Sequence, residues 1–321
     1  MFSNGRALAG IVAGAMLSWL MAEQGFAADP QGTGGQAQKT PAAQTKAPAA
    51  KPETSKPANV ANLTTAQIVE RHVAARGGAQ AWKAVQTLQL SGKLEAGRGD
   101  SYARSMGYVG SSNSRKGPNA IKPTAAHSTE DADKQVLLPF TLDMKRPHLS
   151  RLEIVFDGKT AVQVYDGTQG WKVRPFLNRT DVEPFTADET RSAEAAREEL
   201  EGPLVDYAAK GTKVELEKVE AVEGNQAYKL KLTLKSGTVR HVWIDAKSFL
   251  DVKMDGVPRR MDGKMHDVYV YQRDFRKVEG VTIPFVVETT VAGYPDTHKM
   301  LVEKAAVNPK LDDALFTKPH A

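Results

Sequence analysis

Short stretches of this 321-residue chain alternate between apolar and polar side chains, and this two-residue period constrains the fold more than any other feature. In residues 228–234 four apolar side chains fall on one side and three polar side chains on the other. Strict alternation indicates a strand with one buried and one wet face, which is typical of antiparallel sheet. The pattern predicts a β-rich domain.

Tight turns connect many of these stretches. Further strands are predicted at residues 88–94, 152–156, 162–165, 238–245, 250–255, 264–276, 282–291 and 298–306. Pairs such as Asp157-Gly158, Asp166-Gly167 and Glu279-Gly280 separate neighbouring strands by the length of a hairpin turn. Hairpins in series form a meander, and a long meander must curl to bury its apolar face. Periodicity alone leaves two alternatives open: two packed sheets, or one strongly curved sheet around an apolar hollow.

Helices are predicted outside the run of strands. Thr64 and Gln67 fit a capping box for a helix that Gly77-Gly78 would end. A short second helix is expected at residues 81–85, with Trp82 as its core anchor. Residues 188–200, rich in Glu, Ala and Arg, predict another helix, which residues 202–207 are expected to continue. These segments are natural covers for an open sheet face.

The chain divides into three predicted parts. Residues 1–27 combine a basic residue, an apolar run and small residues before Ala27, which predicts a signal peptide cleaved after Ala27 and a periplasmic location. Residues 28–62, rich in Ala, Pro and Lys, predict a disordered linker. Residues 63–321 then form the folded domain, interrupted by a polar, mobile excursion at residues 110–133.

Composition excludes several classes of function. The chain has no cysteine, which excludes disulfides, a thiolate nucleophile, cysteine-bound metal and lipid attachment through cysteine. The net charge is +5, and residues 28–62 account for +2 of it, from four lysines less Asp29 and Glu53. Arg6 offsets Glu23 in the first segment, which leaves +3 for the folded part. This ordinary surface charge does not indicate a nucleic-acid partner.

No recognisable catalytic or metal-binding pattern occurs. None of the seven histidines stands four residues from another, and there is no HExxH spacing. The chain also has no Gly-x-Ser-x-Gly elbow, no phosphate-binding loop and no GxGxxG motif following a strand. We therefore expect no catalytic residues, no metal, no cofactor and no enzyme activity.

Four stretches resemble the periplasmic outer-membrane lipoprotein-sorting proteins of the LolA/LolB-like superfamily. They are IVERHVAARGGAQAWKAVQTLQLSGKLE, EGPLVDYAAKGTKVELEKVEAVEGNQAYKLKLTLKSGTVRHVWIDAKSFLDVKM, DFRKVEGVTIPFVVETTV and VEKAAVNPKLDDALFTKP. The resemblance implies an α+β fold, a half-open β-barrel of about eleven antiparallel strands around an apolar cavity, with helices as a lid. It also implies a binding or carrier role for lipid or lipoprotein acyl chains. An envelope sensor or protein-interaction module on the same fold is the alternative.

Alternation selects the side chains expected to line the cavity, although each could equally be plain core. They are Leu88, Leu90, Leu152, Ile154, Phe156, Val164, Leu230, Leu232, Leu234 and Trp243. The expected partners are a lipid or lipoprotein acyl chain and an envelope protein, with peripheral membrane contact and a monomeric state. Burying an acyl chain contributes about 0.8 kcal/mol per CH₂, so a carrier that must release its cargo would bury it only partly.

Overall fold

The computed structural model describes residues 62–98, 135–175, 179–195, 200–294 and 297–320. The predicted signal peptide, almost all of the predicted linker and the predicted excursion at residues 110–133 lie outside the described residues. The predictions for those three segments therefore stay predictions.

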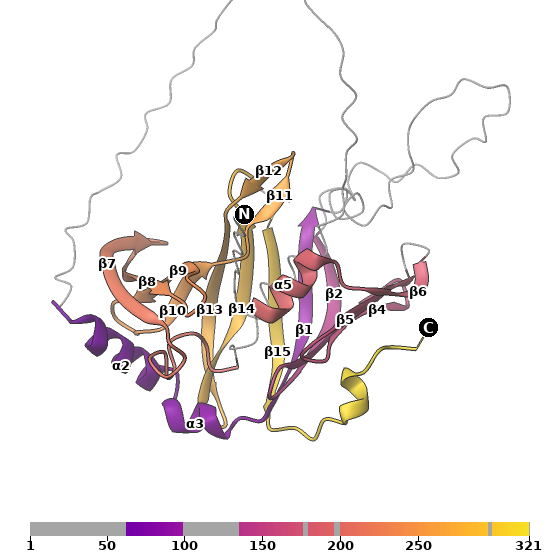
Figure 1. The fold of residues 1–321 in the computed structure, drawn as a ribbon, viewed down its shortest axis with the longest axis horizontal. Helices are drawn as coiled ribbons and strands as arrows, with labels where there is room; N and C mark the ends of the chain where they lie inside the picture. The colour runs from indigo at the N-terminus through magenta and orange to yellow at the C-terminus, as the bar shows by residue number, and fades with distance from the viewer. Residues whose placement is uncertain (1–61, 99–134, 176–178, 196–199, 295–296, 321) are drawn as a thin grey trace, which may run out of the picture.

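One antiparallel sheet of 13 strands dominates the described residues, with a separate hairpin of two short strands (Figure 1). The strands of the sheet are β1 (Thr87–Arg98), β2 (Gln135–Lys145), β3 (Leu149–Phe156), β4 (Lys159–Tyr165), β5 (Gly170–Arg174), β6 (Arg179–Pro184), β7 (Lys213–Val222), β8 (Asn225–Thr233), β9 (Val239–Asp245), β10 (Asp251–Asp255), β13 (Val268–Val278), β14 (Val281–Val291) and β15 (Thr297–Val307). The hairpin consists of β11 (Arg259–Met261) and β12 (Lys264–His266). The predicted α+β, sheet-dominated class is confirmed, but the predicted count of about eleven strands is wrong.

The order of the strands shows how the sheet is assembled. It runs β6-β5-β4-β3-β2-β1-β15-β14-β13-β10-β9-β8-β7, so β6 and β7 are its two edges and the sheet is open. The first six strands form one meander and the later strands form a second. The pairing of β1 with β15 joins the two meanders in the middle of the sheet. The connection from β6 to β7 must therefore pass from one edge of the sheet to the other.

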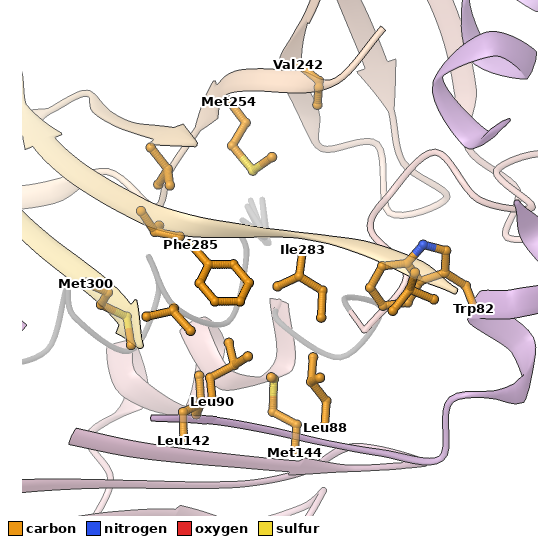
Figure 2. Packing of buried hydrophobic residues seen from close by; sticks show 14 of the residues in the cluster. Trp82, Leu88, Leu90, Leu142, Met144, Val242, Met254, Ile283, Phe285 and Met300 are labelled. Atoms are coloured by element: carbon orange, nitrogen blue, oxygen red, sulfur yellow. The ribbon is translucent and has the colours of Figure 1, made fainter. Parts of the chain in front are cut away.

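The apolar side chains of the sheet collect on one curved inner face. Burial along β14 alternates strictly, and Val281, Ile283, Phe285 and Val287 all belong to the main buried cluster. Figure 2 shows Ile283 and Phe285 pointing toward side chains of β1 and β2 across the interior. Of the two alternatives left open by periodicity, the described residues form the single curved sheet.

A glycine allows the central strand to bend. The register of β1 against β15 shifts between Ser91 and Gly92, as expected at a β-bulge. A Cβ atom on Gly92 would collide with the carbonyl oxygen of Leu301 on β15. Only glycine allows the two backbones to approach so closely, so this residue contributes to the curvature at the centre of the sheet.

Helix α2 begins where its capping box predicts. Helix α2 (Thr65–Ala75) has the expected capping box, in which Thr64 Oγ1 accepts from Gln67 N at 3.3 Å and Gln67 Oε1 accepts from Thr64 N at 2.9 Å. Gly77 and Gly78, both with positive φ, separate α2 from α3 (Ala79–Ala84). Helix α5 (Ala187–Ala195) lies within the segment predicted at residues 188–200, whose residues 196–199 are outside the described residues.

The predicted helical continuation at residues 202–207 is wrong. This segment forms successive turns, and the positive φ angles of Gly202 (86°) and Asp206 (53°) interrupt any helical path. Leu204 and Val205 are nevertheless buried. The crossover is therefore held by apolar contacts rather than by regular backbone structure.

Two neighbouring leucines of β2 provide a test of the inner face. Leu138 is 3% exposed on the inner face, whereas Leu137 is 48% exposed. We expect Leu138→Ala to lower the free energy of unfolding by roughly 2–5 kcal/mol, because it leaves a cavity in the core. Leu137→Ala should change it by less than about 1 kcal/mol. Urea unfolding measures both values, and equal losses would contradict the assignment of the two faces.

Candidate functional site

The inner face of the sheet is the candidate site, because it gathers the largest apolar surface of the domain. Six of the ten predicted wall residues lie within its buried cluster: Leu88, Leu90, Leu152, Ile154, Leu230 and Leu232. Phe156 packs at the margin of this cluster and is only partly buried. The structure thus brings together predicted residues from β1, β3 and β8, which are far apart in the sequence.

Two predicted wall residues lie on the outer face instead. Val164 is paired with Arg151, on the opposite side of the sheet from Leu152 and Ile154. Trp243 lies between two inner-face residues of β9 and packs in a separate cluster with Val222 and Ala227. Because alternate residues of a strand point to opposite faces, an offset of one residue along a strand reverses the assignment.

Leu234 lies just beyond the end of β8 and is partly buried, outside the main cluster. Leu234 closes the turn that follows β8, where its backbone N donates to the carbonyl oxygen of Thr238 at 2.9 Å. The alternation of residues 228–234 is real, but its last residue belongs to the turn. Residue Leu234 therefore has no place in the inner wall that the described cluster forms.

Sequence reasoning missed residues of β2, β14 and β15 that contribute to the inner face. Phe140, Leu142, Ile283, Phe285 and Met300 are buried members of the cluster. The alternation in residues 282–291 could have identified Ile283 and Phe285, because that stretch was already predicted as a strand. In β2 the signal is weaker, since the apolar run Val-Leu-Leu-Pro-Phe does not alternate.

The inner side chains pack on one another in this structure. Figure 2 shows Phe285, Ile283, Leu88 and Met144 converging from opposite sides of the curved sheet. A ligand on this face would have to replace these contacts, so binding requires the sheet or its covers to move. What the arrangement offers chemically is apolar burial rather than a reactive group.

A buried polar network attaches α2, through its C-cap residue Arg76, to the sheet at one end of the inner face. Arg76 Nη1 donates to both carboxylate oxygens of Asp251 at 2.9 Å, and Arg76 Nε donates to the carbonyl oxygen of Thr282 at 3.0 Å. Gln272 Nε2 also donates to Asp251, at 3.3 Å, and Trp82 Nε1 donates to the carbonyl oxygen of Arg76 at 2.8 Å. The network joins α2 and α3 to β10, β13 and β14.

His72 lies beside this network. It is buried, and its Nδ1 is 3.0 Å from the carbonyl oxygen of Phe249. Burial lowers the pKa of His72 below its ordinary value; Asp251 opposes this effect and Arg76 adds to it. His72 is therefore neutral at neutral pH and contributes to the anchor as a hydrogen-bonding group.

A second buried ion pair holds α5 on the sheet near its other edge. Lys172 Nζ of β5 lies 2.6 Å from Glu189 Oε1 of α5, and both side chains are at most 4% exposed. Tyr165 of β4 packs with Ala193 of the same helix. Lys172 is paired with Gln163, which places it on the face of Leu152. Helix α5 thus covers the inner side of β4 and β5, while α2 lies beside β7.

Within the described residues, no group of three or more His, Asp or Glu side chains is arranged to hold a metal ion. The helices among these residues also include none with the length and apolar character needed to cross a membrane. The prediction that the chain is not an enzyme stays a prediction.

Comparison with known proteins gives similarity in structure only. No family model matches the sequence, and no curated protein is significantly similar to it. A LolA superfamily protein from Nitrosomonas europaea aligns with a TM-score of 0.46 and 13% identity, over 80% of this chain and 98% of that one.

A domain provisionally assigned to outer-membrane lipoprotein sorting, from Vibrio parahaemolyticus, aligns with a TM-score of 0.44 and 11% identity, over 78% of this chain and 95% of that one. A DUF1329 family protein from Desulfovibrio piger aligns with a TM-score of 0.46 and 14% identity, over 79% of this chain and 97% of that one. The titles of the first two structures name the same superfamily or the same sorting role as the sequence resemblance, and that of the third does not. At such TM-scores the similarity does not by itself establish a function.

The buried ion pair of Arg76 and Asp251 can be tested against an exposed pair. Asp251→Asn leaves the buried guanidinium without its counter-charge, so we expect the free energy of unfolding to fall by roughly 3–5 kcal/mol. Glu303→Gln removes the exposed partner of Lys93 and should cost less than about 1 kcal/mol. Denaturant titration measures the free energy of unfolding of both variants. A small loss for Asp251→Asn would show that the ion pair does not anchor α2 to the sheet.

Histidine burial predicts that the protein loses stability in acid. The pKa of His72 is lowered, and burial together with Arg259 lowers the pKa of His298 to about 4. Both groups bind protons more weakly when folded than in the unfolded chain, where histidine has a pKa near 6.5. Their contribution to stability is therefore present above about pH 6.5 and is lost as the pH falls, for His298 down to about pH 4.

The variant His298→Gln should reduce this acid loss by roughly 3 kcal/mol between pH 6.5 and 4. His320→Gln, which removes an exposed imidazole, is the matched control and should leave the pH profile unchanged. Unfolding measured at a series of pH values gives both profiles. Superimposable profiles for wild type and His298→Gln would refute the explanation.

Proposed function

We propose that this chain is a periplasmic carrier or binding protein that holds the hydrophobic part of a lipid or a lipoprotein on the inner face of its sheet. The observation that supports this most is the continuous apolar inner face of a single open sheet, which extends from β3 through the centre to β8. The helices touch this sheet near its edges, α5 at β5 and α2 at β7. The long central strands turn their apolar side chains toward the interior.

An open sheet can exchange one set of apolar contacts for another. Because β6 and β7 are not paired with each other, the sheet can change its curvature without separating any strands. Inner side chains such as Phe285 and Ile283 would then exchange contacts with one another for contacts with an acyl chain. Each CH₂ buried contributes about 0.8 kcal/mol, and the lost side-chain contacts oppose this gain. A small net gain suits a carrier that must release its ligand.

The proposed wall keeps the predicted residues that face inward and adds the missed residues of β2, β14 and β15. It consists of Leu88, Leu90, Leu152, Ile154, Leu230, Leu232, Leu142, Ile283, Phe285 and Met300. Export and lipoprotein sorting are parts of the proposal that rest on the segment at residues 1–27 and on the sequence resemblance. The sensor or protein-interaction role on the same fold stays the alternative.

Ligand uptake tests the proposal directly. We expect the purified protein to bind cis-parinaric acid, a fluorescent fatty acid, and native mass spectrometry of protein from the periplasm to show bound lipid. Phe285→Gln places a polar group on the inner face and should weaken the uptake at least several-fold. Val286→Gln is the matched control, because the neighbouring residue points to the outer face.

Circular dichroism would first establish that both variants are folded. Wild-type protein that takes up no fatty acid and carries no lipid would overturn the proposed function. Equal loss of uptake in Phe285→Gln and Val286→Gln would show that binding does not use the inner face.

A further inference from the structure

Arg259, at the start of β11, is buried and has no partner among the described residues. It is only 8% exposed, and neither its Nε nor its Nη2 has a hydrogen-bond partner in that part of the chain. Among the described residues, no carboxylate forms an ion pair with it. Buried polar groups in folded proteins are almost always satisfied, and a lone buried charge is costly.

The guanidinium nevertheless keeps its charge. Burial lowers the pKa of Arg259 to about 10, and burial is the whole cause of that shift. Arg259 therefore remains protonated at neutral pH, and no carboxylate in the part of the chain that the structure describes compensates its charge. A planar fork of donors in a dry surrounding is well suited to a carboxylate or a phosphate oxygen.

Further unsatisfied polar atoms belong to the same region. Thr289 is 1% exposed, and its Oγ1 has no hydrogen-bond partner within the described ranges. Thr289 stands directly opposite His298 in the β14–β15 ladder. Burial, with a smaller contribution from the Arg259 charge, lowers the pKa of His298, and His266 Nδ1 of the hairpin lies 3.3 Å from the carbonyl oxygen of Ala292, just after β14. His266, which faces Arg259 in the β11–β12 hairpin, has a buried Nε2 without a partner. These groups supply donors from three elements.

This polar group interrupts the buried apolar face of β14. On β14 the inner residues Val281, Ile283, Phe285 and Val287 are apolar, and the next inner residue is Thr289. At about 3.4 Å per residue, the apolar part spans roughly 20 Å, comparable with a long acyl chain. Figure 1 shows the β11–β12 hairpin at the end of the long strands that lies opposite α2 and α3. The buried face of β14 is thus apolar from Val281 to Val287 and becomes polar at Thr289, with buried Val291 beyond it. On β13, Gln272 stands opposite Val287, and the Arg276 guanidinium lies over the Phe285 ring.

We propose that Arg259, with Thr289 and His298, binds the anionic head of an amphiphile, a carboxylate or a phosphate, while the chain of that amphiphile lies along β14. This inference rests on the proposed function and narrows the ligand to an acidic lipid. Arg259 would provide the charge, and the hydroxyl and imidazole would provide further hydrogen bonds to the same oxygens.

Ligands with one chain length and different heads test this site. Calorimetry would compare palmitate, hexadecyl phosphate and hexadecanol on wild type, Arg259→Met and Arg260→Met. Arg260 is the exposed neighbour, so its variant removes the same charge without touching the site. We expect Arg259→Met to weaken the binding of at least one acidic ligand tenfold or more, and to change the affinity for hexadecanol by no more than about twofold. Arg260→Met should leave all three affinities unchanged. The acidic ligand whose affinity falls more identifies the head group that the site binds.

A chain-free measurement separates this inference from the proposed function. Inorganic phosphate and acetate should raise the Tm of wild type but not that of Arg259→Met, which should itself be the more stable protein without ligand, because it lacks a buried unpaired charge. If these anions act through Arg259 while no amphiphile binds, the anion site stands and the lipid-binding function fails. If Arg259→Met weakens the acids and the alcohol equally, or has no effect, the anion site is refuted. Should Arg259→Met not fold, Arg259→Lys, which keeps the charge but loses the planar fork, gives the same comparison.

Discussion

The pairing of β1 with β15 is the contact on which the rest of the structure depends. It joins two meanders, one ending at β6 and the other beginning at β7, into a single sheet. Without it each half would expose an apolar face too narrow to curl around an interior. The bulge at Gly92 lies within this same pairing, so the centre of the sheet carries both its continuity and part of its curvature. The inner face exists because these two requirements are met in one pair of strands.

The helical covers are attached by charges rather than by apolar packing alone. Arg76 and Asp251 fix α2 to β10, and Lys172 and Glu189 fix α5 to β5. Buried ion pairs contribute little net stability compared with apolar residues of similar size, but each tolerates only one geometry. Two covers held in this way keep defined positions over an interior whose apolar contacts are not directional. The inner face is therefore covered in a specific arrangement, which a purely hydrophobic core would not require.

Much of this architecture could be predicted from residue patterns, and the failures have physical causes. Alternation predicted β8 from residues 228–234 and β14 from residues 282–291, and the Thr64 capping box predicted α2. Each of these patterns depends on local geometry. Strand β2 was missed because its apolar run Val-Leu-Leu-Pro-Phe does not alternate. Pro139 within it is paired with Lys93 of β1, and the pairing with β3 begins only at Phe140. Val164 and Trp243 were placed on the wrong face because a strand near a turn can start one residue earlier or later. Arg259 carried no signal at all, since burial of a charged residue depends on the tertiary fold.

The position of β15 has a consequence for how the chain reaches its native state. More than half of the chain separates β1 from the strand that completes its ladder, and β15 lies close to the C-terminal end. As synthesis proceeds from the N-terminus, β1 and β2 are made long before their last neighbour. Contacts between such distant segments form slowly and leave apolar surface and an unpaired strand edge exposed in the meantime. In a nascent chain with this order of strands, the β15 side of β1 therefore stays unpaired until β15 has been made.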